Sequence, residues 1–213
     1  MYPFEIHSHT KEHSACSRVP VEHLLARADE LGLAGIVVTD HHYQWPQAEL
    51  EKIARRVTRN GLVVLSAYEL TTADPRTGAH AGDLLVFGGP DDAVMPIWTP
   101  YEEACARAHE LGAVTISAHP FREGMGAGDR IYYMDIDGIE IYNQNHSRLD
   151  VLRARQAVQK AGFLGVAGSD AHRAVQVAQF LTVFERPVRS MEDFKRELLA
   201  RRFHLASNRP DIN

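Results

Sequence analysis

Tyr2-Pro3-Phe4-Glu5-Ile6-His7-Ser8-His9-Thr10 opens the chain and joins a short strand pattern to two histidines. Residues 4–6 predict the strand, and side chains two positions apart on an extended backbone lie on the same face, so His7 and His9 should point the same way. Imidazole is the commonest side-chain ligand of divalent transition metals, and two imidazoles on one strand converge on an ion with little extra ordering. The pair therefore indicates a metal site. Two polar residues at a strand end would give the same pattern, so the rest of the chain must distinguish these interpretations.

Length and composition are those of one globular domain spanning residues 1–213. The chain is 45% hydrophobic and 24% charged, which is enough apolar material for a sizeable core. Its formal net charge of −5 argues against long nucleic acid or an anionic membrane as partner, because both favour a basic surface. The 12 histidines are numerous for this length, and their positions carry most of the functional information.

Cysteine content and the first residues give an expectation for location. Cys16 and Cys105 are too few for a disulfide framework, and the chain start lacks the basic and apolar regions of a signal peptide. No run approaches the roughly 18 apolar residues of a membrane span. We therefore expect a cytoplasmic protein, and the sequence does not predict its oligomeric state.

Strand and helix patterns alternate along the chain. Apolar residues at helical spacing, with Pro near the start or Gly at the end, predict helices at residues 20–32, 46–60, 100–112 and 148–162. Short apolar runs predict seven strands at residues 4–6, 33–39, 62–66, 84–87, 113–117, 137–142 and 164–167. This alternation is typical of an α/β protein with parallel strands, either a doubly wound sheet or a barrel.

Metal-ligating residue types recur directly after five of these strands. They are His7 and His9, Asp40 and His41, Glu69, His119, and Asp170 and His172. In parallel α/β folds the carboxyl ends of the strands meet on one face, where active sites lie. A crevice between two strands of an open sheet could hardly collect side chains from five strand ends, whereas the mouth of a barrel can. The barrel is therefore favoured.

The same motifs resemble those of the polymerase and histidinol phosphatase (PHP) domain family. The matching segments are His7-Ser8-His9-Thr10, Thr39-Asp40-His41, Glu69, Ala118-His119-Pro120 and Gly168-Ser169-Asp170-Ala171-His172. They occur in the family's order and span nearly the whole chain. The resemblance implies a distorted seven-stranded (β/α)7 barrel of the TIM-like type, whose mouth holds two or three divalent metal ions. It also implies that the protein hydrolyses phosphate esters.

The resemblance also implies a set of ligands. His7, His9, Glu69 and Asp170 would bind one metal, Glu69 would bridge to a second metal bound by His119, and His41 and His172 would serve a third. Imidazole and carboxylate ligands together suit zinc, manganese or iron. A metal-activated water would be the nucleophile, so no separate catalytic side chain is assigned.

The chain departs from the family pattern at two places. Family members usually carry a further ligand after the H-x-H motif, and here Glu12, His13 and Cys16 compete for that role. Some relatives have a histidine at the end of the fourth strand, where residues 87–89 read Phe-Gly-Gly. Glu140 or His80 could supply the missing ligand.

Two carboxylates have alternative roles. Glu140 should face the barrel interior if Ile139 and Ile141, its neighbours on the predicted strand, pack under the helices. Asp40 is either a ligand or a partner that orients a histidine.

Arg122, His42 and His146 are candidates for binding substrate, and a guanidinium such as that of Arg122 can hold a phosphate through two hydrogen bonds. The predicted activity is a metal-dependent phosphoesterase acting on a small phosphorylated metabolite or nucleotide. The alternatives are a noncatalytic or regulatory metal-binding module, and an exonuclease or an amide or lactone hydrolase that uses the same metal site.

Overall fold

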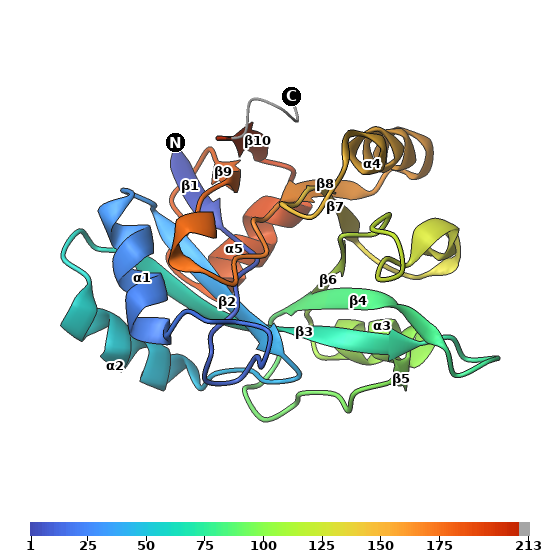
Figure 1. Cartoon of the computed structure of the whole chain (residues 1–213), viewed down its shortest axis with the longest axis horizontal. Helices are drawn as coiled ribbons and strands as arrows, with labels where there is room; N and C mark the ends of the chain where they lie inside the picture. Colours follow the sequence, from blue (N-terminus) through green and yellow to red (C-terminus); the bar gives the residue numbers. More distant parts are fainter. Residues whose placement is uncertain (209–213) are drawn as a thin grey trace.

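The computed structural model, which describes residues 1–208, consists of one mixed sheet that curls into a nearly closed barrel (Figure 1). Its strands follow the order β10-β9-β1-β2-β3-β4-β6-β7-β8, and the short β5 pairs with β3. The strands are β1 (Tyr2–Glu5), β2 (Gly35–His41), β3 (Val63–Ala73), β4 (His80–Phe87), β5 (Thr99–Pro100), β6 (Val114–Ala118), β7 (Gly138–Tyr142), β8 (Leu164–Ala167), β9 (Phe180–Phe184) and β10 (Phe203–Ser207).

The strand directions correct the expectation of seven parallel strands. β1, β2 and β3 are parallel to one another, as are β6, β7 and β8, but β4 is antiparallel to both β3 and β6. The connection between β3 and β4 covers only residues 74–79, whereas a parallel crossover needs about a dozen residues or more. β9 and β10, which the sequence analysis did not predict, are antiparallel to β1 and to β9 respectively.

Side chains bridge the two ends of the sheet path on the β8–β9 side. The Thr182 hydroxyl of β9 accepts a hydrogen bond from the Ala167 N–H and donates to its carbonyl, at 3.1 and 2.9 Å. The Ser169 hydroxyl makes the same pair of contacts with the backbone of Phe180. These bonds replace a backbone ladder and leave the barrel nearly closed.

The barrel interior is apolar and is plugged at one end by α5 (Met191–Leu199). The Phe194 ring of this helix lies 5.0–6.2 Å from the rings of Phe4, Phe87 and Phe184, measured between centroids. Phe4 lies on the parallel strand β1, whereas Phe87 and Phe184 end strands that run in the opposite sense. The plug therefore occupies the end of the barrel opposite the carboxyl ends of β1, β2 and β3.

The four predicted helices are confirmed on the outside of the barrel as α1 (Val21–Glu30), α2 (Gln47–Val57), α3 (Tyr101–Glu110) and α4 (Arg148–Ala161). α1 and α2 lie side by side in Figure 1 and share an apolar cluster with β2, β3 and β9. α3 and α4 pack over β4 and β7 in a second outer cluster. Helix α4 begins with a Ser147–Asp150 capping box and ends at Gly162, whose φ of 75° suits glycine. None of the helices within residues 1–208 is long and apolar enough to cross a bilayer.

The plug predicts a stability test on α5. Phe194→Ala removes a fully buried ring from the apolar interior and should lower the free energy of unfolding by about 3–5 kcal/mol, because it leaves a cavity. Leu199→Ala, at a 54% exposed position at the end of the same helix, should cost less than about 1 kcal/mol. Urea unfolding followed by circular dichroism measures both, and equal losses would show that α5 does not plug the barrel.

Candidate metal centre

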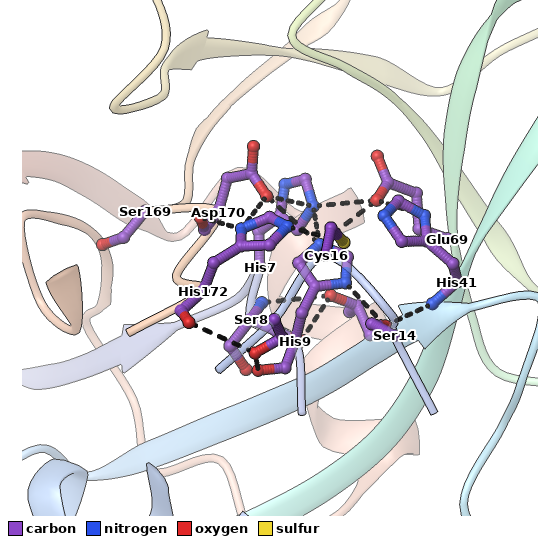
Figure 2. A network of polar contacts seen from close by, with 12 residues as sticks. His7, Ser8, His9, Ser14, Cys16, His41, Glu69, Ser169, Asp170 and His172 are labelled. Atoms are coloured by element: carbon purple, nitrogen blue, oxygen red, sulfur yellow. Dashed lines mark hydrogen bonds and ion pairs between the residues drawn. The ribbon is translucent and has the colours of Figure 1, made fainter. Parts of the chain in front are cut away.

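Imidazoles and carboxylates converge at the barrel end where β1, β2 and β3 finish. Figure 2 shows imidazoles gathered with carboxylates from segments far apart in the sequence. They belong to His7, His9, His41, Glu69, Asp170 and His172, and His119 joins them from the end of β6. The structure thus brings together the strand-end residues that the sequence analysis singled out, Asp40 excepted.

Glu69 lies at the centre of this cluster and is fully buried. Its Oε2 atom is 3.3 Å from His7 Nε2, 3.2 Å from His9 Nε2 and 3.2 Å from His41 Nδ1. Its Oε1 atom is 3.2 Å from His119 Nε2. The two oxygens of one carboxylate therefore face different histidines, an arrangement that suits a ligand bridging two cations.

Asp170 contacts three histidines of the cluster. Its Oδ1 atom lies 3.1 Å from His9 Nε2, 3.5 Å from His7 Nε2 and 3.3 Å from His172 Nδ1. Its Oδ2 atom accepts a hydrogen bond from Asn145 at 2.7 Å. The backbone at Asp170 has a φ of 54°, a sparsely populated conformation for an aspartate that is typical of functional sites.

The donor atoms form three overlapping groups, each with its atoms within 4.8 Å of one another. The groups are His7, His9 and Glu69; Glu69, Asp83 and His119; and His9, His41 and His172. Within the first group the separations are 3.0–3.3 Å, close to the value of about 3.3 Å between ligand atoms around a tetrahedral zinc ion. His7 Nε2 and His9 Nε2 face each other at 3.0 Å, so a single cation could be bound by both nitrogens. The residues present fit divalent metal ions.

Outer hydrogen bonds fix which nitrogen each histidine of the H-x-H motif presents. His7 Nδ1 lies 2.9 Å from Glu140 Oε1, so an N–H at this position leaves Nε2 free for a cation. His9 Nδ1 lies 3.3 Å from the Ser14 hydroxyl, which donates to Asp40 Oδ1 at 2.6 Å and therefore accepts from His9. Both histidines consequently aim Nε2 at Glu69 and Asp170.

Burial and charge shift the pKa values of these groups in opposite directions. Burial favours neutral imidazoles, but the surrounding carboxylates outweigh it and raise the pKa of His7 well above its usual value and that of His9 to about 10. Burial likewise favours neutral carboxylic acids, but the neighbouring histidines outweigh it and lower the pKa values of Glu69 and Asp170. The carboxylates are therefore ionised at neutral pH, and protonated imidazoles balance them when no cation is bound.

Asp83 belongs to the cluster, and the sequence analysis missed it. It is 2% exposed, and its Oδ2 atom lies 3.9 Å from His119 Nε2. The sequence predicted that a ligand from this strand would lie at its end, at residues 87–89. Because β4 is antiparallel, the start of the strand, and not its end, lies at the barrel mouth. The short connection at residues 74–79 was the sequence signal for an antiparallel β4, and an antiparallel β4 would have placed Asp83 at the mouth. His80 lies 3.5 Å from Asp83 and outside the three donor groups.

Glu140 faces the barrel interior, as predicted, because Ile139 and Ile141 pack in the outer cluster beneath α4. Both of its oxygens are occupied. Oε1 contacts His7, and Oε2 accepts from the His119 backbone N–H at 2.8 Å and from Asn143 at 2.9 Å. This arrangement supports an orienting role in place of the ligand role considered from the sequence.

Gly168 gives Glu140 and His7 the room that they need. A Cβ atom at this position would lie 2.6 Å from His7 Cβ and 2.9 Å from Glu140 Oε1. A larger residue here would therefore displace the pair.

Both carboxylate oxygens of Asp40 are likewise occupied by hydrogen bonds. It is buried and accepts hydrogen bonds at 2.6–2.7 Å from the Thr10 backbone and hydroxyl, from Ser14 and from the Trp45 indole. Of the two roles left open for Asp40, the structure supports orientation, through Ser14, of His9.

The structure separates the three candidates for the additional N-terminal ligand. Cys16 Sγ lies 3.1 Å from His172 Nε2, beside the outer donor group. Burial raises the thiol pKa, but contact with His172 outweighs it, so the pKa of Cys16 is lowered overall. His13 is exposed and stacks on Tyr43, and Glu12 accepts hydrogen bonds from the Val21 N–H at the start of α1. Cys16 alone of the three is adjacent to the cluster.

The cluster opens into a cavity of about 500 Å³. Arg122 and Cys16 are among its lining residues. His42 is half-buried at the end of β2 and is not part of the lining, and His146 is buried with its Nδ1 atom 3.0 Å from the Ile141 carbonyl. Of the three candidates for substrate contact, Arg122 is the one that borders the cavity.

The Glu140 geometry predicts a loss of metal affinity in Glu140→Gln. Three donors, from His7, His119 and Asn143, need acceptors on both oxygens, and a glutamine supplies only one acceptor. We expect metal affinity to fall about 10–100-fold, as for other partners of ligating histidines, in a competition titration with a chromophoric chelator. Glu102→Gln, at an exposed position on α3, is the control and should bind metal normally. Wild-type affinity in Glu140→Gln would contradict the orienting role.

The raised histidine pKa values predict proton release on metal binding. At pH 7 the nitrogens of His7 and His9 hold protons that must leave when a cation binds, so apparent affinity should rise with pH up to about 10, the pKa of His9. Calorimetric titration with zinc in buffers of different ionisation enthalpy measures the number of protons released. An enthalpy that does not change with the buffer would show that the histidines are already neutral.

Sequence comparison finds a family model that is similar to the C-terminal quarter of the chain. A family model described as PHP-associated matches residues 150–203, from within α4 to the start of β10. An uncharacterized protein of Methanocaldococcus jannaschii is 27% identical over 124 residues. That alignment covers 58% of this chain and 66%, slightly under two thirds, of the archaeal protein.

Solved structures share the fold over nearly the whole chain at low sequence identity. A two-domain protein from Bacteroides vulgatus, containing a predicted PHP-like metal-dependent phosphoesterase, gives a TM-score of 0.72 at 18% identity over 97% of this chain and 64% of its own. An amidohydrolase from Chromobacterium violaceum with bound sulfate gives 0.69 at 16% identity over 99% of both chains. A lesion-specific endonuclease from Pyrococcus furiosus gives 0.63 at 15% identity over 93% of this chain and 56% of its own. The C-terminal family-model match and the shared fold make the chain similar to PHP-like proteins, and its grouped His, Glu and Asp side chains are consistent with this similarity.

Proposed function

We propose that the protein is a metal-dependent hydrolase of small phosphate esters. The observation that carries the proposal is the position of Arg122, which borders the cavity four residues after β6 and three after His119. Among residues 1–208 no carboxylate forms an ion pair with Arg122, so its guanidinium is available to a substrate anion. A cavity with metal-binding groups at its base and such a guanidinium on its wall suits a phosphate group.

The residues divide the work in this proposal. Glu69 would hold two cations, one together with His7, His9 and Asp170 and the other together with Asp83 and His119. Bound divalent cations supply an acidified water as nucleophile and positive charge against the developing negative charge. Arg122 holds the phosphate oxygens in one orientation, and Glu140 keeps His7 in place.

The donor set leaves the choice of metal among zinc, manganese and iron, with two or three ions per chain. The first two groups combine carboxylate and imidazole, which all three metals accept. The outer group consists of imidazoles, from His9, His41 and His172, and lies beside Cys16. If the thiol is a ligand, this third position should prefer zinc.

The alternatives differ in what they require of the cavity. An amide or lactone hydrolase uses the same metal groups, and the amidohydrolase of similar fold keeps this possibility open, but a neutral substrate gives Arg122 nothing to bind. A nuclease acting on long DNA needs a basic track, and the net charge of −5 does not favour one. A noncatalytic module needs no open cavity above its metal groups.

Hydrolysis of a panel of phosphate monoesters and diesters by protein reconstituted with manganese or zinc tests the proposal. Chelation should abolish activity, and Asp170→Asn should lower kcat/KM at least about 1,000-fold, because several kcal/mol of charge stabilisation depend on the cations. Asp92→Asn, at an exposed position, should keep full activity and metal content. If the loaded protein cleaves amides or lactones and no phosphoester, or if Asp170→Asn keeps its metal content and the panel stays inert, the proposal fails.

A further inference from the structure

Two arginines besides Arg122 line the cavity, in the loops that follow β1 and β8. Arg18 and Arg173 both border it, and the Arg18 backbone N–H donates to the His172 carbonyl at 3.0 Å, so the two residues are neighbours across this contact. Among residues 1–208 neither guanidinium has a hydrogen bond or an ion pair. Two guanidiniums without a partner among the described residues therefore border the cavity from neighbouring loops.

Arginines elsewhere on the molecule are mostly paired. Arg107 contacts Glu110, Arg196 contacts Asp193 and Arg202 contacts Glu197, each on or near the last turn of a helix. Like charges that lie close together without a counterion repel each other. A group of unpaired guanidiniums beside a cavity is thus a specific feature of this wall, and an anion is the ligand that relieves the repulsion.

Arg18 lies across the mouth from Arg122. In the sheet order, β1 and β6 are separated by β2, β3 and β4 on one side and by β7, β8 and β9 on the other. Arg18 is in the loop after β1, and Arg122 is in the loop after β6. The metal groups therefore lie between Arg18 and Arg122, so one phosphate does not engage both of these arginines.

The rest of the lining suits a small hydrophilic molecule. Apart from Met125 and Cys16, the described lining residues all carry polar or charged side chains, among them the amides of Gln144, Asn145 and Gln176. A volume of about 500 Å³ is within the range of small-ligand sites. These side chains offer several hydrogen-bonding groups to a small hydrophilic ligand.

We propose that the substrate carries two separated anionic groups, one a phosphate ester at the metal centre beside Arg122 and the other a phosphate or carboxylate held by Arg18 and Arg173. The identity of the first group rests on the proposed function, whereas the second site does not. The planar guanidinium matches either anion through paired hydrogen bonds. The substrates are thus bisphosphates or phosphorylated carboxylic acids of small size.

The test uses the full, metal-loaded chain and a matched series of substrates. Alkanediol bisphosphates from ethane-1,2-diol to hexane-1,6-diol and ω-carboxyalkyl phosphates are compared with hydroxyalkyl monophosphates of the same lengths. At the length that spans the mouth from Arg122 to Arg18, kcat/KM for the doubly anionic substrates should exceed that of the monophosphate about 10–100-fold, the effect of a charge-assisted hydrogen-bonding pair. The carboxylate series distinguishes a phosphate site from one that takes any anion.

Arg18→Gln and Arg173→Gln should each lower that ratio about tenfold. Arg186→Gln is the matched control, because Arg186 is exposed and follows β9, which runs antiparallel to β1 and ends at the plugged end of the barrel. This variant should keep both the activity and the ratio of wild-type protein.

Equilibrium binding separates this inference from the proposed activity. Propane-1,3-bisphosphonate and propylphosphonate are titrated calorimetrically into wild type and into the two arginine variants. Tighter binding of the bisphosphonate that is lost in the variants supports the second anion site, even if no phosphoester is cleaved. Equal binding of the two phosphonates, or a ratio that neither arginine variant changes, overturns it and leaves the phosphoesterase proposal standing.

Discussion

Four carboxylates are buried together at one end of the barrel, and the structure of this end depends on the positive charge that meets them. Glu69, Asp83, Glu140 and Asp170 are each at most 2% exposed. An ionised carboxylate removed from water without a partner costs several kcal/mol. Imidazoles surround these groups, and the nearby carboxylates raise the pKa values of His7, His9 and His119, which favours protonated rings that offset the charge in the absence of metal. Cation binding then exchanges protons for metal ions without leaving the carboxylates unbalanced.

The barrel aligns these groups through contacts near the position where β8 and β9 lack a backbone hydrogen-bond ladder. β8 and β9 are connected by the hydroxyls of Thr182 and Ser169, and the loop that follows β8 carries Asp170. The same loop is tied to the H-x-H segment by a bridge between Ser8 and Ala171. Closure of the sheet and alignment of the histidine and carboxylate cluster therefore depend on the same contacts. The apolar plug at the other end of the barrel stabilises both.

The sequence predicted α1 to α4 and most members of the histidine and carboxylate cluster, because both depend on local pattern. Apolar residues at helical spacing gave α1 to α4, and polar residues directly after apolar runs gave His7, Glu69 and His119 among others. Strand direction was not local information. A short apolar run has the same composition in either direction, so β4 was assigned as parallel and Asp83 was overlooked. β9, α5 and β10 were not predicted, although residues 180–184 form an apolar run, because such a run does not reveal its pairing partner.

The roles of the outer residues could not be predicted for a different reason. Whether Glu140 or Asp40 has a free oxygen depends on donors that tertiary folding brings from other segments, such as the backbone N–H of His119 or the indole of Trp45. Each of these carboxylates has the chemistry of a ligand and the surroundings of an orienting group. The distinction appears only when their hydrogen bonds are counted.

Opposite charges are arranged at different depths of the same cavity. The base carries carboxylates that exclude anions unless cations or protons offset them, and the walls carry guanidiniums that attract anions from solvent. An anionic substrate drawn to Arg18, Arg122 or Arg173 therefore meets a favourable base only after metal has bound. If cations bind at the base and the substrate is anionic, as we propose, metal loading and substrate binding are coupled, because the cations reverse the sign of the electrostatic potential at the base of the cavity.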